Sequence, residues 1–413
     1  MPAGVGCKRM TNLPPGWRCG TLQDVVAGIT TGVSVNGEDR PRGPGEVGVL
    51  KISCVLRGRF DPAHYKTVIS ADRARVVAPV TGGTILVSRA NTAELVGASA
   101  YVPQSVSDLF LPDKLWQLKP GKNVDVRWLS HVVADPAFRP KLASAATGTS
   151  ASMKNISQEA FLALAIAIPP LPEQRRVAAI LGTWDAAIEK GERLLDAAQR
   201  QFEALRTELY REDGSEERLT FGGFLDESRI PGNDGSTARK LTVKLYGKGI
   251  GPKQDRTAGS ANTRYYIRRA GQFIYSRLDF LNGAFAVVPD HLDGFQSTLD
   301  LPAFDIAPRV SPIWLLNYVT RPAYYENQQN LARGQRVARR VNPDDLLASE
   351  IAVPTRERQD EVAALLTLCI DEINSIRSLV AALRRQKTGL MQKLLTGQAR
   401  VPAAVADLSP AAD

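Results

Sequence analysis

One short pattern occurs twice in this chain of 413 residues, and the two copies stand almost half the chain apart. The first copy is IPPLPEQRRVAAIL, residues 168–181, and the second is AVPTRERQDEVAALL, residues 352–366. Their prolines and their glutamines share one offset, since 354 − 169 and 359 − 174 both equal 185. A repeat with a fixed offset predicts a chain made of two halves with the same architecture.

An apolar stripe follows each of the two proline-marked starts. Its spacings alternate between four and three residues, which is the heptad pattern of a helix with a coiled-coil seam. The first stripe consists of Val177, Leu181, Trp184, Ile188, Gly191, Leu195, Ala198, Phe202, Leu205 and Leu209, and the second consists of Val362, Leu366, Cys369, Ile373, Ile376, Val380, Leu383, Lys387, Leu390 and Leu394. We therefore predict two long helices, at 168–212 and 353–400, that pair along this seam.

The alternative for these segments is two ordinary amphipathic helices of a bundle. The first stripe corresponds to about 50 Å of helix at 1.5 Å per residue, which favours the paired coiled coil. Proline explains the helix starts, because its φ is fixed and it has no N–H to leave unpaired in the first turn. Glu173 then places negative charge near the positive end of the helix dipole. Gly191 and Lys387 weaken the seam, and Gly397 is a typical stop signal for the second helix.

Two larger segments with a different composition lie outside the predicted helices. Residues 12–167 and 213–352 are rich in Gly, Pro, Thr and Val, and contain short alternating runs such as GTILVSRA and QFIYSRLD. Such runs are typical of strands closed by turns, and each segment has the usual size of one domain. We expect the order globular domain, helix, globular domain, helix, between a lead at 1–11 and a disordered tail at 401–413.

The overall composition, with 44% hydrophobic and 23% charged residues, is that of an ordinary soluble protein. The formal net charge of +9 favours a polyanionic partner such as nucleic acid. The N-terminus has no apolar run of signal-peptide length, and no stretch approaches about 18 consecutive apolar residues. We therefore expect a cytoplasmic protein with no membrane partner.

No motif in the sequence predicts covalent chemistry. GPGEVG at 43–48 fits G-x-G-x-x-G but follows no predicted strand, and YGKGIGPK at 246–253 lacks the ending of a phosphate-binding loop. The histidines, His64, His131 and His291, are isolated, and the four cysteines include no CxxC pair. The Asn-Pro-Pro-aromatic run with which amino-methylating DNA enzymes hold an extruded base is missing as well. We expect no catalytic residues, no metal and no cofactor.

Basic residues gather in three stretches that suit contact with DNA. They are LKISCVLRGRF at 50–60, NTRYYIRRAGQF at 262–273 and NLARGQRVARRVN at 330–342. Arginine is well suited to gripping phosphates and to reading guanine edges. A solvated basic face is the alternative for any one of these stretches, but three of them in a basic chain favour DNA contact.

Four stretches in their order along the chain resemble the specificity (S) subunit of type I restriction-modification systems. They are LPPGWRCGTLQDVVAGITTG from Leu13; GGTILVSRANTAELVGASA with FLPDKLWQL; GQFIYSRLDFLNGAFAVVPDHLDGFQSTLDLPAF; and IPPLPEQRRVAAIL with its C-terminal partner ending in KTGLMQKLLTG. The resemblance covers residues 12 to about 400. The second copy departs from the pattern at TRERQ, near Thr355, where it lacks Pro-Leu-Pro, so the exact start of the second helix stays open.

The resemblance implies an α+β protein with two target recognition domains, each of mixed α/β structure, at 12–167 and 213–352. The long helices would separate and follow these domains and pair as an antiparallel coiled coil, with an internal pseudo-two-fold repeat. Each domain would read half of a split DNA target, and helix length would set the unread gap, with about 34 Å between half-sites one DNA turn apart. The implied partners are double-stranded DNA, two methyltransferase (M) subunits that bring the chemistry, and restriction (R) subunits.

Candidate DNA contacts come from both halves of the chain. For one half-site they are Lys51, Arg57, Arg59, Arg89 and Lys154, and for the other they are Arg264, Arg277, Arg333, Arg336 and Arg340. Arg89 in SRAN and Arg277 in SRLD occupy like positions, each after a serine that follows a predicted strand, although a structural carboxylate is an alternative partner for either. The coiled-coil seam is assigned to Leu181, Ile188, Leu195, Leu366, Ile373 and Val380.

Two other classes of function stay open on the sequence. A nuclease or methyltransferase that acts alone is disfavoured by the lack of a cofactor or metal motif. Methylation of DNA by the purified chain with only the cofactor added would favour that class. A structural adaptor that scaffolds other proteins would bind no duplex, or would bind it without dependence on salt.

Overall fold

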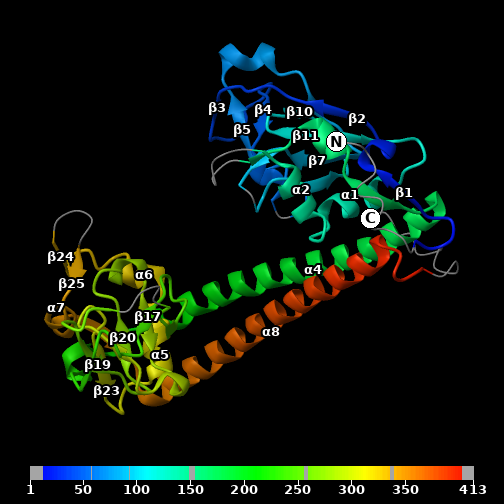
Figure 1. The fold of residues 1–413 in the computed structure, drawn as a ribbon. Coiled ribbons are helices and arrows are strands. Elements are labelled where there is room, and N and C mark those ends of the chain that lie inside the picture. Colours follow the sequence, from blue (N-terminus) through cyan, green and yellow to red (C-terminus); the bar gives the residue numbers. More distant parts are fainter. Residues whose placement is uncertain are drawn as a thin grey trace. The chain divides into compact units, whose positions relative to one another are not determined.

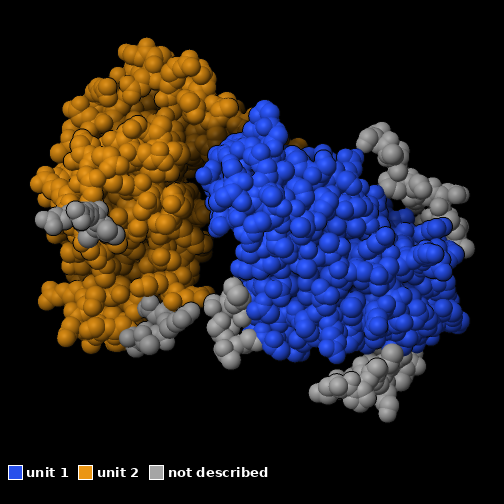
Figure 2. Space-filling model, turned by 90° about the horizontal axis from the view of Figure 1, so that it is seen from above, with its two compact units in different colours: residues 1–193, 377–413 blue, residues 194–376 orange. Residues whose placement is uncertain are grey.

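The computed structural model describes residues 13–56, 58–92, 94–147, 154–254, 259–334 and 339–401. Two compact units make up the chain, one formed by residues 1–193 with 377–413 and the other by residues 194–376 (Figure 2). Each unit contains antiparallel sheets, short helices and a stretch of both long helices (Figure 1). The predicted mixed α and β fold is therefore confirmed. None of the described helices is long and apolar enough to cross a membrane.

The main sheet of unit 1 has four antiparallel strands in the order β2-β11-β7-β9, which are Val26–Thr31, Leu115–Pro120, Thr84–Ser88 and Ser99–Val102. Strand β7 is buried on both faces, because alternate side chains enter different cores. Ile85 and Val87 belong to a core that contains Trp128. Leu86 belongs to a second core on the other face, which it shares with Leu109.

A second sheet packs on the Leu86 face of unit 1. It has five strands in the order β3-β5-β4-β10-β6, which are Gly37–Glu38, Tyr65–Val68, Gly48–Leu50, Val106–Phe110 and Pro79–Val80. The remaining elements are β8 Ala90–Asn91 paired with β12 Lys154–Asn155, α1 Val126–Ala134, α2 Arg139–Ala145, α3 Gln158–Leu162, and the 3-10 turns η2 Leu22–Asp24, η3 Ile52–Val55 and η4 Ser70–Arg75. Strands β3 to β6 are thus inserted between the first two strands of the main sheet.

Unit 2 repeats the main sheet of unit 1. Its order is β15-β23-β20-β21, which are Leu225–Ser228, Ala303–Ile306, Phe273–Tyr275 and Phe285–Val287. In both units the first strand along the chain lies at one edge, followed by the fourth, the second and the third. The central strand again divides two cores, since Phe273 and Tyr275 join Trp314 whereas Ile274 joins Leu241. The sequence repeat is therefore a repeat of structure.

The segment inserted into unit 2 differs from its counterpart in unit 1. It comprises β16 Pro231–Asp234 and β19 Arg264–Ile267, which form a three-stranded sheet with β22 Gln296–Ser297, and the hairpin of β17 Leu241–Val243 with β18 Ile250–Pro252. The other elements are the hairpin of β24 Ala332–Arg333 with β25 Arg340–Val341, α5 Pro312–Val319, α6 Pro322–Tyr325, α7 Pro343–Ala348, and the 3-10 turns η5 Phe221–Gly223, η6 Phe280–Asn282 and η7 Asp290–Leu292. The two units therefore share a main sheet and differ in what is inserted into it.

The chain enters and leaves each sheet region through a pair of neighbouring strands. Strand β1, Arg18–Thr21, pairs antiparallel with β13, Ala165–Ile168. Strand β14, Glu217–Thr220, pairs in the same way with β26, Glu350–Val353. Each of β13 and β26 leads through proline into a long helix. The predicted domain limits at 12–167 and 213–352 stay a prediction, and most of the predicted tail, 402–413, lies outside the described residues.

The long helices are α4, Leu171–Leu209, and α8, Arg356–Leu395. No seam position of α4 or α8 is exposed. In unit 1, Val177 of α4 shares a core with Leu394 of α8, and in unit 2, Leu209 packs against the core that holds Leu366. The two helices therefore pair antiparallel within each unit. Among the six assigned seam residues, Leu181, Leu366, Ile373 and Val380 are buried, and Ile188 and Leu195 are half-buried.

The two weak seam positions have local explanations in unit 1. Lys387, in place of an apolar residue, forms an ion pair with Asp185. Gly191 lies where the helices approach closely, because a Cβ atom there would be 2.7 Å from Cγ2 of Val380. Glycine therefore permits the close approach, and the lysine keeps a charged partner.

The repeated glutamines bridge each long helix to the short helix that packs beside it. Gln174 accepts a hydrogen bond from the N–H of Asp125, the residue before α1, at 2.9 Å and donates one to the carbonyl of Pro169 at 2.9 Å. Gln359 accepts from the N–H of Ser311, the residue before α5, at 2.7 Å and donates to Pro354 at 2.9 Å. Both amides are buried and need such partners. The 185-residue repeat therefore preserves a hydrogen-bonded joint.

Candidate nucleic-acid interface

The inserted sheet of unit 1 carries a cluster of two half-buried lysines and one exposed carboxylate. Lys51, just before η3, forms an ion pair with Asp39, and Nζ of Lys66 on β5 is 3.7 Å from the same carboxylate. Hydrogen bonding and attraction to the lysines lower the pKa of Asp39, so it stays ionised. The two lysines carry one more positive charge than Asp39 neutralises, and this charge is available to a phosphate.

Arg59 does not join this cluster but faces α4. Its Nη1 atom is 3.9 Å from carboxylate oxygens of both Glu189 and Glu192. Arg59, Glu189 and Glu192 line a cavity of about 470 Å³ in unit 1. Lys387 and the buried His131 line the same cavity. Arg57 lies outside the described residues.

Arg89 and Arg277 occupy matching places in the two units. The N–H of Arg89 donates to the carbonyl of Lys114 at 3.1 Å, and its carbonyl accepts from Ile156 at 3.0 Å. The N–H of Arg277 donates to the backbone carbonyl of Asp300 at 2.9 Å, and the carbonyl of Arg277 accepts from the N–H of Val341 at 3.0 Å. Both residues therefore follow a buried strand of the main sheet and have a fixed backbone.

The two guanidinium groups are half-buried. Nε of Arg89 donates to the carbonyl of Asp113 at 2.7 Å, and Arg277 bonds to the side chain of Asn342. Neither forms an ion pair with a carboxylate in the part of the chain that the structure describes. Nε of Arg277 is buried without a hydrogen-bond partner. Lys154 lies on β12, where its backbone stands opposite Asn91 of β8.

The arginine-rich run of unit 2 forms the β24–β25 hairpin. Arg333 is largely exposed and pairs with Asp345, and Nε of Arg340 is 3.8 Å from a carboxylate oxygen of Asp300. Arg339 donates to the side chain and the carbonyl of Gln329, each at 2.7 Å. Arg336 lies outside the described residues. The described arms of the hairpin thus carry three arginines.

Of the three arginines of NTRYYIRRAGQF, Arg264 and Arg269 are exposed and Arg268 is buried, and Arg269 forms an ion pair with Asp293. Arg264, at the start of β19, is exposed and has no ion-pair partner within the described residues. Arg268 is fully buried and donates to Oγ of Ser297 and to the carbonyl of Ser228, each at 2.7 Å. Burial lowers the pKa of Arg268 to about 10. Arg268 therefore holds strands together, whereas Arg264 is free to contact a ligand.

Sequence patterns did not reveal the basic turn between β17 and β18, which exposes Lys244, Tyr246 and Lys248. The spacing of this stretch does not match that of a phosphate loop. A better signal is its charge, since residues 239–254 contain five Lys or Arg and no Asp or Glu. A run with several cations and no carboxylate in its sequence is typical of a surface that meets a polyanion.

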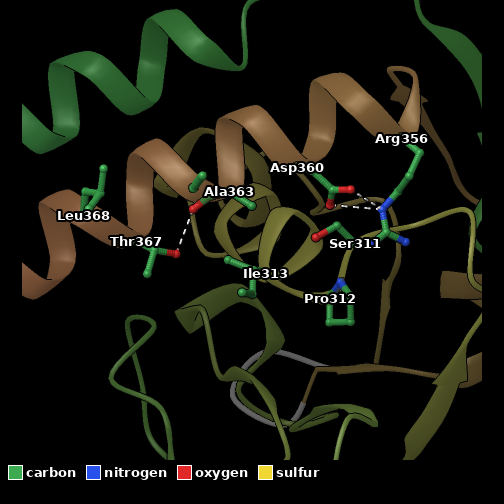
Figure 3. A pocket seen from close by; sticks show the side chains of 9 residues that line it. Ser311, Pro312, Ile313, Arg356, Asp360, Ala363, Thr367 and Leu368 are labelled. Atoms are coloured by element: carbon green, nitrogen blue, oxygen red, sulfur yellow. Dashed lines mark hydrogen bonds and ion pairs between the residues drawn. The ribbon is translucent and has the colours of Figure 1, made fainter.

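An apolar groove of about 650 Å³ lies on unit 2 between the start of α5 and the first turns of α8 (Figure 3). Ile313 and Leu368 line it and are 49% and 67% exposed. Arg356 and Asp360 form an ion pair at one end, with an N to O distance of 3.0 Å. Exposed apolar side chains of this kind suit contact with a protein better than contact with DNA. Across the described residues, no group of three or more His, Cys, Asp or Glu could hold a metal ion.

Comparison with known proteins relates the chain to one group. Residues 14–196 match the family model described as type I restriction modification DNA specificity domain. The specificity subunit of the type I restriction enzyme EcoEI from Escherichia coli is 26% identical over 190 residues. That match covers 46% of this chain and 32% of the relative, so it spans about a third of the relative's length.

Solved structures show the same fold along most of the chain. The S subunit of a type I restriction-modification system from M. genitalium has a TM-score of 0.57 at 12% identity, covering 93% of this chain and 97% of that one. A second solved chain comes from a structure on complex assembly and conformational transition of the type I R-M system. It has a TM-score of 0.57 at 17% identity, covering 94% of this chain and 100% of that one. The resemblance to type I specificity subunits is confirmed.

Proposed function

We propose that this chain, with its type I DNA specificity domain, is a sequence-specific DNA-binding subunit that reads a bipartite target. One observation carries this proposal. The two units share their main sheet, paired strands and glutamine joint, but differ in the strands inserted between the first two strands of the sheet. Two DNA-binding units with the same framework and different inserted strands fit a target with two different half-sites. The helices that join them would set the length of the unread gap.

Surface cations would supply the affinity for the duplex. Lys51, Arg264 and the arms of the β24–β25 hairpin place positive charge on the inserted or peripheral strands. Contacts of this type release counterions from DNA, so binding would weaken as salt rises. Arg57 and Arg336 belong to the same proposal from their sequence positions. Lys154 and Arg59 stay predictions, and Arg59 would first have to leave Glu189 and Glu192.

Arg89 and Arg277 would act as fixed arms rather than as mobile phosphate contacts. Backbone hydrogen bonds hold each residue on both sides, so little conformational freedom is left to lose on binding. Base contacts specify sequence, whereas phosphate contacts position the protein.

Assembly with other subunits would supply the chemistry. The apolar groove beside α8 is a surface on which an M subunit could dock, and the repeat of the fold would favour two M copies. R subunits would join this core. The chain itself would be non-catalytic, with no cofactor or metal of its own, and would act in the cytoplasm.

Mapping methylated adenines tests the proposal directly. A host without DNA methylation would carry this chain, its neighbouring methyltransferase gene, or both. The expected result is one split motif with a fixed gap, marked only when both are present. A mark left by this chain alone would make it an enzyme. No mark, with no salt-dependent binding to any duplex, would favour a structural adaptor instead.

A further inference from the structure

The turn between β17 and β18 presents side chains that the fold itself does not use. Its residues 244–249, Lys-Leu-Tyr-Gly-Lys-Gly, are called the Tyr246 turn below. Tyr246 is 59% exposed and Leu245 is 37% exposed. Lys244 and Lys248 are exposed, and neither has an ion-pair partner among the described residues. Nζ of Lys248 lies 5.8 Å from the centroid of the Tyr246 ring.

The backbone of Tyr246 is in a conformation that side chains disfavour. Its φ is 58°, and no other described residue except glycine has a positive φ. In this left-handed region the Cβ atom approaches the following carbonyl oxygen, so bulky residues are rare there. Strained residues of this kind persist where the surrounding structure holds them, and they gather at functional sites.

Neighbouring backbone holds the Tyr246 turn in place. The N–H of Tyr246 donates to the carbonyl of Asn282 at 2.8 Å, and the N–H of Gly247 donates to Gly283 at 2.8 Å. The N–H of Lys244 donates to Gly249 at 2.8 Å and closes the hairpin. These bonds fix the turn against η6, so the ring is presented to solvent from a rigid base.

The charge around the turn identifies the kind of ligand. Lys244 and Lys248 are the cations of the turn itself, and the hairpin that carries them, residues 241–252, contains no Asp or Glu. A polyanion fits this run, and an exposed aromatic ring flanked by cations fits the alternation of bases and phosphates in DNA. A protein partner would need a far larger apolar area than one tyrosine and one leucine provide.

We propose that the Tyr246 turn enters a groove of duplex DNA, where the ring of Tyr246 packs against bases while Lys244 and Lys248 bind the flanking phosphates. Side chains that wedge against base steps in this way are known to distort the duplex locally. Unit 1 has no counterpart among its described residues, since its positive φ values all belong to glycine. The contact therefore belongs to one half-site only. This inference rests on the proposed function and adds a residue that determines how that half-site is read.

Tyr246→Gly is the decisive variant, because glycine adopts a φ of 58° without strain and removes only the ring. Its thermal stability should equal or exceed that of the wild type. Tyr246→Phe is the matched control and should keep most of the binding. The probe is a labelled duplex with the motif mapped by methylation, titrated with the complex of this chain and its M subunits. We expect Tyr246→Gly to weaken binding about tenfold.

Further measurements separate the inference from the proposed function. Lys244→Ala and Lys248→Ala should each reduce the slope of log K against log salt by about one, which a purely structural role would not do. Unchanged binding of the motif by Tyr246→Gly would overturn the inference and leave the proposed function intact. Loss of assembly with the M subunits, at unchanged duplex binding, would assign the turn to a protein partner and overturn the inference too. A wild-type complex that binds no duplex would overturn both.

Discussion

Replacing Gln359 by alanine tests whether the repeated glutamine holds the long helix α8 to the rest of unit 2. The side chain is fully buried and makes three hydrogen bonds. It accepts from the N–H of Ser311 at 2.7 Å and donates to the carbonyls of Pro354 at 2.9 Å and Arg309 at 3.1 Å. A buried donor or acceptor left unpaired costs about 1–3 kcal/mol. We expect a loss of about 3 kcal/mol in the local stability of α5.

Hydrogen exchange measures this loss at one amide in each unit. The N–H of Leu315 donates to Ser311 at 2.9 Å and reports on α5, and the N–H of Leu129 donates to Asp125 at 3.0 Å and reports on α1. In Gln359→Ala the protection of Leu315 should fall about a hundredfold, because every 1.4 kcal/mol corresponds to a factor of about ten. The protection of Leu129 should not change.

The repeat supplies a reciprocal control for this experiment. Gln174→Ala removes the equivalent bonds to Asp125 and Pro169, so it should expose Leu129 and spare Leu315. Equal protection of Leu315 in the wild type and in Gln359→Ala would refute the view that the glutamine is a joint. A loss of protection at both amides from either variant would show that the two joints are not independent.

Three further outcomes follow from the seam, the basic surface and a buried histidine. Leu195→Asp places a charge on the half-buried seam and should abolish assembly with M subunits, and intact assembly in size-exclusion chromatography would contradict the coiled-coil assignment. Arg264→Ala should weaken duplex binding and lower the slope of log K against log salt by about one, at unchanged stability. Arg268→Ala, which removes a buried side chain, should instead lower the unfolding temperature. The proposed function also predicts that Arg336→Ala weakens binding to one half-site. Burial, with Lys387 and Arg127 nearby, lowers the pKa of His131 to about 3. Because the unfolded chain binds a proton near pH 6.5 and the folded chain does not, stability should fall with decreasing pH in this window, and His131→Asn should remove about 2 kcal/mol of the loss between pH 7 and pH 5 in denaturation curves.

The long helices were predictable because their signal is local. Heptad spacing from Val177 to Leu209 depends only on neighbouring turns of one helix, and its repetition 185 residues later marks the partner. The same pattern showed that Gln174 and Gln359 recur, but not what they bind. Their partners Asp125 and Ser311 stand 49 and 48 positions away, each directly before a short helix, and the repeat does not point to them.

The site was less predictable, because exposure depends on distant strands. Arg264 and Arg268 lie in one short run and have the same chemistry. Arg268 is buried only because Ser228 and Ser297, 40 and 29 positions away, supply oxygens to its guanidinium. Tyr246 is strained and outward-facing because Asn282 holds its backbone, and no spacing of residues along the sequence encodes that contact.

The paired strands at the base of each sheet region have a consequence for inheritance. Because Arg18 stands opposite Ile168, and Glu217 opposite Val353, the two ends of each region leave the rest of the protein at almost one point. A region cut at these strands can be exchanged for another whose ends meet in the same way, and the helices need not change. If the proposed function holds, recombination at two places in the gene would replace one half-site of the DNA target. The other half-site and the gap between the two would stay the same.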